Sequence, residues 1–259
     1  MTALITGASS GIGLELARLC AEHGHDVALV ARNERALADL AGALRRERGV
    51  RAVAVAADLS SAAGVDRVVA RVSELGLSID LLVNNAGYGV YGRFSETPRD
   101  EELRMIQLNI AALTDLTKRF LPPMLERREG RILNVASTAA FLPGPLMSVY
   151  YATKAYVLSF SEALANELAG TGVSVTILCP GPTASNFQAA AGLQDSKLVF
   201  GKTLATSREV AEAGYDGMMT GKTLVIPGVS NMLIANVPRL LPRRLVAKVV
   251  RTAQERRRR

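Results

Sequence analysis

The sequence predicts an α/β fold, a doubly wound parallel sheet of about seven strands with helices on both faces. Short β-rich apolar runs alternate with longer helical stretches along the chain. The runs are nearly all apolar, which is typical of parallel strands buried on both faces. Right-handed crossovers then place helices on both sides of the sheet. The 259 residues are 49% hydrophobic and 21% charged, which fits an ordinary globular protein and excludes disordered, collagen-like and disulfide-rich chains.

Seven apolar runs predict the strands, and the stretches between them predict the helices. We expect strands, in chain order, at 3–6, 26–31, 51–56, 79–83, 131–135, 173–178 and 223–226. We expect helices at 11–22, 33–48, 61–75, 98–128 and 150–169. The second helix begins at Asn33, which is a good N-cap because its side chain can accept from a free backbone N–H.

A glycine-rich turn joins the first expected strand to the first expected helix. Its glycines are spaced differently from the G-x-G-x-x-G fingerprint. Glycines let the backbone approach a ligand closely, and a helix N-terminus offers N–H groups and partial positive charge to a pyrophosphate. Tight turns also need glycine for geometry alone, so the position within a strand–helix–strand unit is what indicates a dinucleotide. The residues expected to hold it are Gly7, Ser9, Ser10, Gly11, Ile12 and Gly13.

Arg32 follows the second expected strand and indicates which nicotinamide cofactor fits. An acid at this point binds the ribose 2′-OH of NAD, whereas an arginine suits the 2′-phosphate of NADP through a bidentate fork. No acid competes at Ala31 or Arg32, so NADP is favoured and NAD is the weaker candidate. A solvated loop arginine is the alternative. The segment 8–10 adds no basic residue, so Arg32 carries the argument with help from Arg35 alone.

Tyr150 and Lys154 lie four residues apart at the start of an expected helix. Residues at this spacing share a helix face, so the ammonium of Lys154 can lie near the Tyr150 phenol. A nearby cation favours the phenolate, which makes Tyr150 a usable general acid or base. No other tyrosine has a lysine at this spacing. Ser137 follows the strand 131–135, so we expect its hydroxyl at the carboxyl edge of the sheet, near a substrate carbonyl. Closing a turn is the alternative role for this serine.

Several motifs occur in a fixed order along the chain. They are the glycine turn at 6–13, Asn84-Asn85-Ala86-Gly87, Asn109, Ser137, Tyr150-x-x-x-Lys154 and Pro180-Gly181. Together they resemble the short-chain dehydrogenase/reductase family in its single-domain form, over about residues 2 to 183. Within that family, the stretches 135–160 and 179–183 resemble a bacterial carbonyl reductase-like subgroup. The resemblance implies a Rossmann-type fold and an NAD(P)-dependent oxidoreductase acting on CH–OH groups.

The resemblance also implies roles for individual residues. Tyr150 would exchange a proton with the substrate oxygen, Lys154 would lower the pKa of Tyr150 and hold the nicotinamide ribose, Ser137 would position the carbonyl, and Asn109 would anchor a water in a proton relay. Further cofactor contacts are expected from Asp58, Leu59, Asn85, Ala86, Gly87, Pro180, Gly181 and Thr183, besides Tyr150 and Lys154. Plainer alternatives are a solvent-facing helical Asn109, an Asp58 that opens the next helix and an Asn85 that belongs to a turn.

We expect residues 1–229 to form the NAD(P)-binding domain, with a substrate lid at about 184–203. The apolar residues expected to border the site indicate an apolar carbonyl or secondary alcohol as substrate. They are Tyr88, Tyr91, Phe94, Phe141, Leu142, Leu146 and Met147. Packing of the domain is the alternative for each of them. A catalytically silent NAD(P)-binding regulatory or scaffold protein is the alternative function. The family resemblance also implies a homodimer or homotetramer built on the helices 98–128 and 150–169.

Residues 230–259 are expected to form a basic C-terminal appendage. The net charge of the chain is +7, yet nine basic residues and one acid lie between positions 239 and 259, so the rest is nearly neutral. An amphipathic basic helix from Pro242 onward is able to lie on an anionic membrane, although packing on the body with a solvated basic face is the favoured interpretation. No nucleic-acid motif occurs, and the cysteines and histidines form no metal-ligand grouping. No secretory signal is evident, so we expect a cytoplasmic protein.

Overall fold

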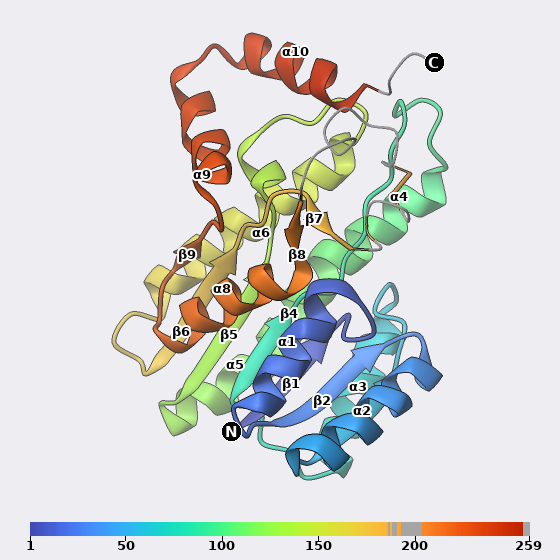
Figure 1. Cartoon of the computed structure of the whole chain (residues 1–259), viewed down its shortest axis with the longest axis vertical. Coiled ribbons are helices and arrows are strands. Elements are labelled where there is room, and N and C mark those ends of the chain that lie inside the picture. Colours follow the sequence, from blue (N-terminus) through green and yellow to red (C-terminus); the bar gives the residue numbers. More distant parts are fainter. Residues whose placement is uncertain (186, 188–190, 193–203, 256–259) are drawn as a thin grey trace.

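The computed structural model describes residues 1–185, 187, 191–192 and 204–255, apart from the side chain of Arg239. Its centre is a seven-stranded, all-parallel sheet in the order β3-β2-β1-β4-β5-β6-β9 (Figure 1). The strand order reverses between β1 and β4, and ligands of open α/β sheets bind in the crevice at such a reversal. The predicted α/β fold is confirmed.

The strands of the main sheet coincide closely with the predicted apolar runs. They are β1 (Thr2–Thr6), β2 (Asp26–Ala31), β3 (Ala52–Ala56), β4 (Leu81–Asn84), β5 (Gly130–Val135), β6 (Val173–Leu178) and β9 (Leu224–Val225). A separate pair consists of β7 (Thr183–Ala184) and β8 (Ala205–Thr206).

Helices cover both faces of the sheet (Figure 1). The helices are α1 (Gly11–Glu22), α2 (Glu34–Arg48), α3 (Ala62–Glu74), α4 (Arg99–Ile106), α5 (Leu113–Arg127), α6 (Ser148–Glu167), α8 (Ser207–Met219), α9 (Val229–Asn236) and α10 (Arg243–Gln254). The 3-10 turns are η2 (Thr138–Phe141) and η3 (Val237–Leu240). Helices α1, α2 and α8 pack on one face and α3, α5 and α6 on the other, so each face buries its own apolar core.

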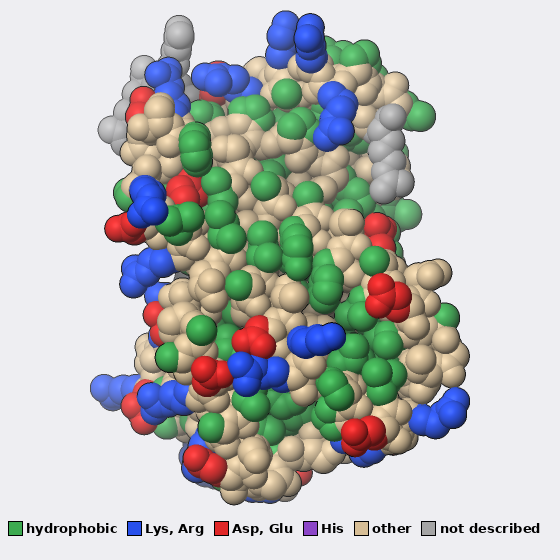
Figure 2. Space-filling model, turned by 180° about the vertical axis from the view of Figure 1, so that it is seen from behind, with side chains coloured by type: hydrophobic (Ala, Val, Ile, Leu, Met, Phe, Trp, Pro, Cys, Tyr) green, Lys and Arg blue, Asp and Glu red, His purple; other side chains and the backbone are tan. Residues whose placement is uncertain are grey.

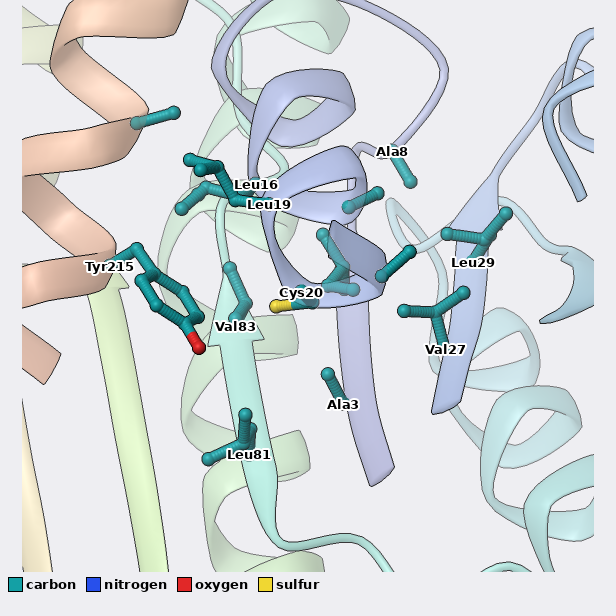
Figure 3. Packing of buried hydrophobic residues seen from close by; sticks show 14 of the residues in the cluster. Ala3, Ala8, Leu16, Leu19, Cys20, Val27, Leu29, Leu81, Val83 and Tyr215 are labelled. Carbon is teal, nitrogen blue, oxygen red and sulfur yellow. The ribbon is translucent and has the colours of Figure 1, made fainter. Parts of the chain in front are cut away.

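The core under α1 fixes the turn that leads into this helix. Leu16, Leu19 and Cys20 of α1 point to the sheet, where they meet Val83 of β4 and the ring of Tyr215 from α8 (Figure 3). All five side chains are almost fully buried. The α1 axis, and with it the glycine turn at the carboxyl end of β1, is therefore held by packing.

The predicted long helix at 98–128 is interrupted. Residues Gln107–Ala112 form a π-helical segment, η1, between α4 and α5. A π-helical turn inserts an extra residue and turns the following side chains, and such insertions are frequent at functional sites. The predicted cap of α2 is confirmed, since Asn33 accepts a hydrogen bond of 3.0 Å from the Ala36 N–H.

The C-terminal segment folds as α9, η3 and α10 at the upper end of the molecule (Figure 1). Val246 and Val250 of α10 are buried against the cluster that contains Tyr150 and Tyr151. Within the described ranges, no helix is both long enough and apolar enough to cross a bilayer. Most of the predicted lid at 184–203 lies outside the described residues.

Candidate active site

A cleft of about 1420 Å³ opens at the carboxyl ends of the strands, around the reversal of strand order. This volume exceeds the few hundred to 1,000 Å³ of an ordinary small-molecule site and leaves room for a dinucleotide together with a substrate. The cleft brings together nearly all of the predicted site residues. Those that line it are Gly7, Ser9, Ser10, Gly11, Ile12, Arg32, Asp58, Leu59, Asn85, Ala86, Gly87, Ser137, Tyr150, Lys154, Pro180, Gly181 and Thr183. Two predicted residues, Gly13 and Asn109, lie behind the lining.

The glycine turn is built from backbone in close contact. Gly7 has a φ of +67°, and a Cβ there would lie 3.1 Å from the Cα of Ala86. Gly13 belongs to the first turn of α1, where a Cβ would lie 2.4 Å from the Gly7 carbonyl oxygen. The lack of a side chain at Gly13 therefore lets α1 pack closely against the glycine turn, whereas Gly7 faces the cleft.

Thr6 ties this turn to the loop after β4. Its buried hydroxyl donates to the Val83 carbonyl at 3.1 Å and accepts from the N–H groups of Asn85 and Ala86 at 2.9 and 3.0 Å. The Asn85 side chain donates to the Thr6 carbonyl at 2.9 Å. The N-cap residue of α1, Ser10, makes no side-chain capping bond, and the first turn of α1 holds no acid. This arrangement suits a pyrophosphate, because the helix N–H groups face the cleft without an acidic competitor.

The outer end of the cleft carries two arginines and one acid. Arg32 is exposed at the end of β2 and lines the cleft, and so does Arg104 of α4. Asp58 accepts from the Ser60 hydroxyl at 2.7 Å, and this bond, with smaller contributions from Arg32 and Arg104, lowers the pKa of the Asp58 carboxyl. Arg35, by contrast, does not line the cleft. A phosphate at this end would meet guanidinium groups from two separate elements.

Tyr150, Lys154 and Ser137 meet in the middle of the cleft. The Lys154 ammonium lies 5.9 Å from the centroid of the Tyr150 ring and donates to the Val135 carbonyl at 2.8 Å. The hydroxyl of Ser137 is a hydrogen-bond partner of the Tyr150 phenol. Ser137 also caps η2, since it accepts from the Ala139 N–H at 3.1 Å. The turn-closing role and the position beside Tyr150 therefore coexist in this serine.

Burial controls the protonation of this pair. It raises the pKa of Tyr150 above its ordinary value, against the hydrogen bond from Ser137, which lowers it. It lowers the pKa of Lys154 from 10.5 to about 8. The predicted lowering of the Tyr150 pKa is therefore wrong: its pKa is raised, because a buried site disfavours the charged form of the phenol. The environment favours a protonated phenol, the form that donates a proton.

Asn109 is buried rather than facing solvent. It lies in η1, where its side-chain amide donates to the Tyr88 carbonyl and to the Thr153 hydroxyl, each at 3.0 Å, and its oxygen accepts from the Tyr88 N–H at 3.2 Å. A Cβ on Gly87 would lie 3.0 Å from the same oxygen and 3.5 Å from the Lys154 nitrogen. Asn109 therefore links the loop after β4 to α6. Its contact on α6 is Thr153, the residue next to Lys154.

The other end of the cleft is apolar. Tyr88, Tyr91, Leu142, Leu146 and Met147 line it as predicted, joined by Phe187 and Ile234. Two predictions are wrong. Phe94 is 68% exposed and lies outside the lining, and Phe141 packs against the cluster of Leu113 and Val157 beneath η2. Both lie near lining residues in sequence, but the chain turns their side chains away.

The C-terminal helix adds a polar contact beneath this apolar end. Gln254 is fully buried, and its amide donates to the hydroxyl of Tyr151, the neighbour of Tyr150. The Gln254 carbonyl accepts from the Tyr91 hydroxyl at 2.9 Å. Both tyrosines line the cleft. Helix α10 therefore holds two tyrosines that line the apolar end of the cleft.

Sequence reasoning missed several residues of this site. Thr6 stood inside the glycine motif, and its β-branched side chain at a strand end was a usable signal. Thr153 lies on the buried face of α6 between the two predicted catalytic residues, which was a second signal. No signal in the sequence indicated Arg104, Ile234 or Gln254, because only the packing of distant helices brings these residues to the cleft.

Comparison with known proteins finds relatives that agree with the predicted family. The family model for short chain dehydrogenases matches residues 1–196. Ketoacyl reductase HetN of Nostoc sp. is 36% identical over 180 residues, which cover 70% of this chain and 62% of that protein. The chain thus spans less than two thirds of the length of this relative.

Two solved structures share the fold. A short-chain dehydrogenase from Sphingobium yanoikuyae in complex with NADPH has a TM-score of 0.84 and 34% identity, with 98% of each chain covered. A short-chain dehydrogenase/reductase from Burkholderia phymatum in complex with NAD has a TM-score of 0.82 and 26% identity, with 92% of each chain covered. The predicted family is confirmed, while the carbonyl reductase-like subgroup stays a prediction. The chain belongs to the short-chain dehydrogenase family.

Proposed function

We propose that this protein is an NADP-preferring oxidoreductase that transfers hydride between the nicotinamide and an apolar carbonyl or secondary alcohol. One observation carries the proposal. The buried phenol of Tyr150, with Ser137 as its hydrogen-bond partner, lies where the glycine-lined part of the cleft meets the apolar part. A Cβ on Gly89 would touch Met147, Tyr150 and Phe187 together, so the ring of Tyr150 is itself part of the apolar wall.

Residues of this chain donate the proton and position the substrate. When bound, NADPH supplies the hydride. Because burial raises the pKa of Tyr150, its phenol is protonated at neutral pH and donates the proton to the carbonyl oxygen in the reducing direction. Ser137 orients that oxygen. Lys154 brings a positive charge that stabilises the phenolate as the proton leaves.

The residues at the other end fit a phosphorylated dinucleotide. The cradle of Gly7 and the N-terminus of α1 suit the pyrophosphate. Arg32, together with Arg104 of α4, suits the 2′-phosphate of NADP through charge-assisted hydrogen bonds. The NADPH complex of the Sphingobium yanoikuyae relative supports this choice, and the NAD complex of the Burkholderia phymatum relative makes the selectivity worth measuring.

Initial rates of NADPH oxidation, measured with the full chain on bulky apolar ketones and on polyhydroxylated sugars, test the proposal. We expect kcat/KM on apolar ketones to exceed that on sugars by roughly tenfold or more, since each buried CH₂ contributes about 0.8 kcal/mol. Equal rates on sugars would contradict the apolar substrate. Cofactor binding without turnover on any carbonyl would contradict the enzyme and favour a silent binding protein.

We further propose a homodimer or homotetramer formed through α4, α5 and α6. Leu103 and Ile106 of α4 and Tyr156 of α6 are exposed apolar side chains, and Tyr156 stacks on Phe160 with ring centroids 5.8 Å apart. Burying such side chains is a usual source of stability in two-fold interfaces. Sedimentation velocity should give the mass of two or four chains and a smaller mass for Tyr156→Glu. A native monomer at every concentration would contradict this assembly.

A further inference from the structure

We propose that α9, η3 and α10, which we term the C-terminal unit (residues 229–255), dock on an anionic lipid surface and place the apolar end of the cleft beside it. The docking itself stands independently of the proposed reaction. Delivery of an apolar substrate from that surface to the cleft rests on the proposed function.

The C-terminal unit turns its apolar side chains outward. Of the fifteen large apolar side chains that are exposed among the described residues, nine lie between positions 229 and 249. In α9 the outward face includes Val229, 75% exposed, with Met232 and Leu233 three and four residues later. Leu240 of η3 is 87% exposed. A helix of a globular protein normally turns such a face to the core, and contiguous exposed apolar patches mark interaction sites.

Helix α10 divides its surface into three faces. Val246, Val250 and Gln254 follow one another at four-residue spacing and are buried against the body. Leu245 and Val249, which precede the buried valines by one residue each, form an exposed apolar flank. Arg244, Lys248 and Arg251 share a third face, which is exposed. The predicted apolar stripe of this helix is therefore split, and only half of it packs on the body.

The charge of this surface has one sign. No Asp or Glu occurs between residues 217 and 254. Within the described residues Arg251 forms an ion pair of 3.7 Å with Glu255, and no acid pairs with Arg243, Arg244 or Lys248. In Figure 2, blue and green side chains lie side by side at the end that carries the C-terminal unit. Apolar side chains next to unneutralised cations complement anionic headgroups above acyl chains.

The same features count against other occupants. A second copy of the chain would bring like charges together across a two-fold interface, which opposes self-association. A nucleic acid would gain nothing from exposed aliphatic side chains, and residues 229–255 contain no aromatic residue for base stacking. An anionic bilayer satisfies both the apolar and the basic side chains.

The C-terminal unit adjoins the cleft directly. Ile234 of α9 is 39% exposed and also lines the cleft with Leu142 and Leu146. A Cβ on Gly181 would lie 2.2 Å from the Asn231 side chain, so α9 is packed against the Pro180–Gly181 segment of the site. An apolar molecule dissolved in the bilayer would thus meet the mouth of the cleft without crossing bulk water.

Co-sedimentation of the full chain with vesicles tests the docking. Vesicles of phosphatidylcholine mixed with phosphatidylglycerol are compared with vesicles of phosphatidylcholine alone. The charge variant is Arg244→Gln with Lys248→Gln, and the apolar variant is Leu233→Ser with Leu245→Ser. The matched control is Arg46→Gln with Arg67→Gln, which removes two exposed cations from α2 and α3. Circular dichroism is used to check that each variant is folded.

We expect the native chain to bind the anionic vesicles and not the neutral ones. The charge variant should bind about twenty-fivefold more weakly, since each of its two lost basic residues strengthens binding to an anionic surface about fivefold. The apolar variant should also bind more weakly, and the control should match the native chain. Absence of native binding, equal binding to neutral vesicles, or an equal loss in the control would overturn the proposal. Self-association in solution that the apolar variant abolishes, without vesicle binding, would assign the surface to a second copy instead.

Failure of the reductase assay leaves this test intact, because it measures binding and not turnover. If both proposals hold, anionic vesicles should raise the rate on a ketone that partitions into them. They should leave the rate on a water-miscible ketone unchanged.

Discussion

The two ends of the cleft are built in different ways. The proposed cofactor end combines consecutive backbone of the β1–α1 turn, held by the Thr6 hydroxyl and by close contacts at Gly7 and Gly13, with the side chains of Arg32 and Arg104 farther out. The proposed substrate end, which is the apolar end of the cleft, consists of side chains from segments far apart in sequence, held by apolar packing and by hydrogen bonds to Gln254. A site made of backbone is specified by a short local motif. A site made of packed side chains depends instead on how distant elements pack. A substitution among those side chains can change the lining of the apolar end while the backbone of the glycine turn stays the same.

The largest effect should come from Gly13→Ala at the cofactor end. Its Cβ would lie 2.4 Å from the carbonyl oxygen of Gly7, and backbone cannot move away as a side chain can. We expect a loss of about 3 kcal/mol in the free energy of unfolding, measured by urea titration, together with weakened NADPH binding.

Gly42→Ala is the matched control, because it also places a methyl group on a helical glycine. There the nearest atom is the flexible end of Arg46 at 3.3 Å. Alanine favours helix over glycine by about 1 kcal/mol, so this variant should be more stable than the native protein. If the two substitutions destabilise equally, the close backbone contact at Gly13 does not explain the result.

Arg32→Ala should change cofactor choice without changing stability. A hydrogen bond to a charged group contributes about 1.5–3 kcal/mol, so NADPH should bind roughly tenfold to a hundredfold more weakly. Affinity for NADH should stay the same. Arg35→Ala is the control, since Arg35 does not line the cleft. Calorimetric titration of both cofactors measures the difference, and a native preference for NADH would contradict the role of Arg32.

Gln254→Ala should affect the substrate end alone. It leaves the Tyr151 hydroxyl without its partner and removes packing behind the cleft, at a cost of about 1–3 kcal/mol in unfolding free energy. The KM for an apolar ketone should rise severalfold while the affinity for NADPH is unchanged. Thr252→Ala, on the exposed side of α10, should leave both constants as they are. A parallel loss of NADPH affinity in Gln254→Ala would show that the two ends are not separable.

Lys154→Met should raise stability while it lowers turnover, and the gain should depend on pH. Burial lowers the pKa of Lys154 from 10.5 to about 8, so holding its charge costs stability at neutral pH, partly offset by its bond to Val135. We expect a net gain of roughly 1 kcal/mol at about pH 7. The unfolded chain binds more protons between about pH 8 and 10.5, so the native protein recovers stability there and the gain of the variant shrinks. Thermal unfolding at both ends of this range checks the sign, and a gain that grows with pH would contradict it.

The same contrast explains which features could be predicted from sequence. Strands and the glycine turn were predictable because each is fixed by local residue type, such as the apolar runs of β2 and β6. The order and spacing of Ser137, Tyr150 and Lys154 indicated one site. The π-helical turn at Asn109 was not predictable, because its partners Tyr88 and Thr153 come from other elements. Arg104 and Gln254 reach the cleft only through the packing of α4 and α10.

In the proposed reaction, Tyr150 donates the proton where the two ends of the cleft meet. Single-turnover reduction of an apolar ketone by enzyme-bound NADPH, compared for Tyr150→Phe and Tyr151→Phe, measures this proton transfer. The two variants each remove one hydroxyl from neighbouring buried tyrosines on α6. We predict that Tyr150→Phe slows the chemical step by about a hundredfold to ten-thousandfold with NADPH affinity unchanged, while Tyr151→Phe stays close to native. Equal rates for the two variants would contradict this role of Tyr150.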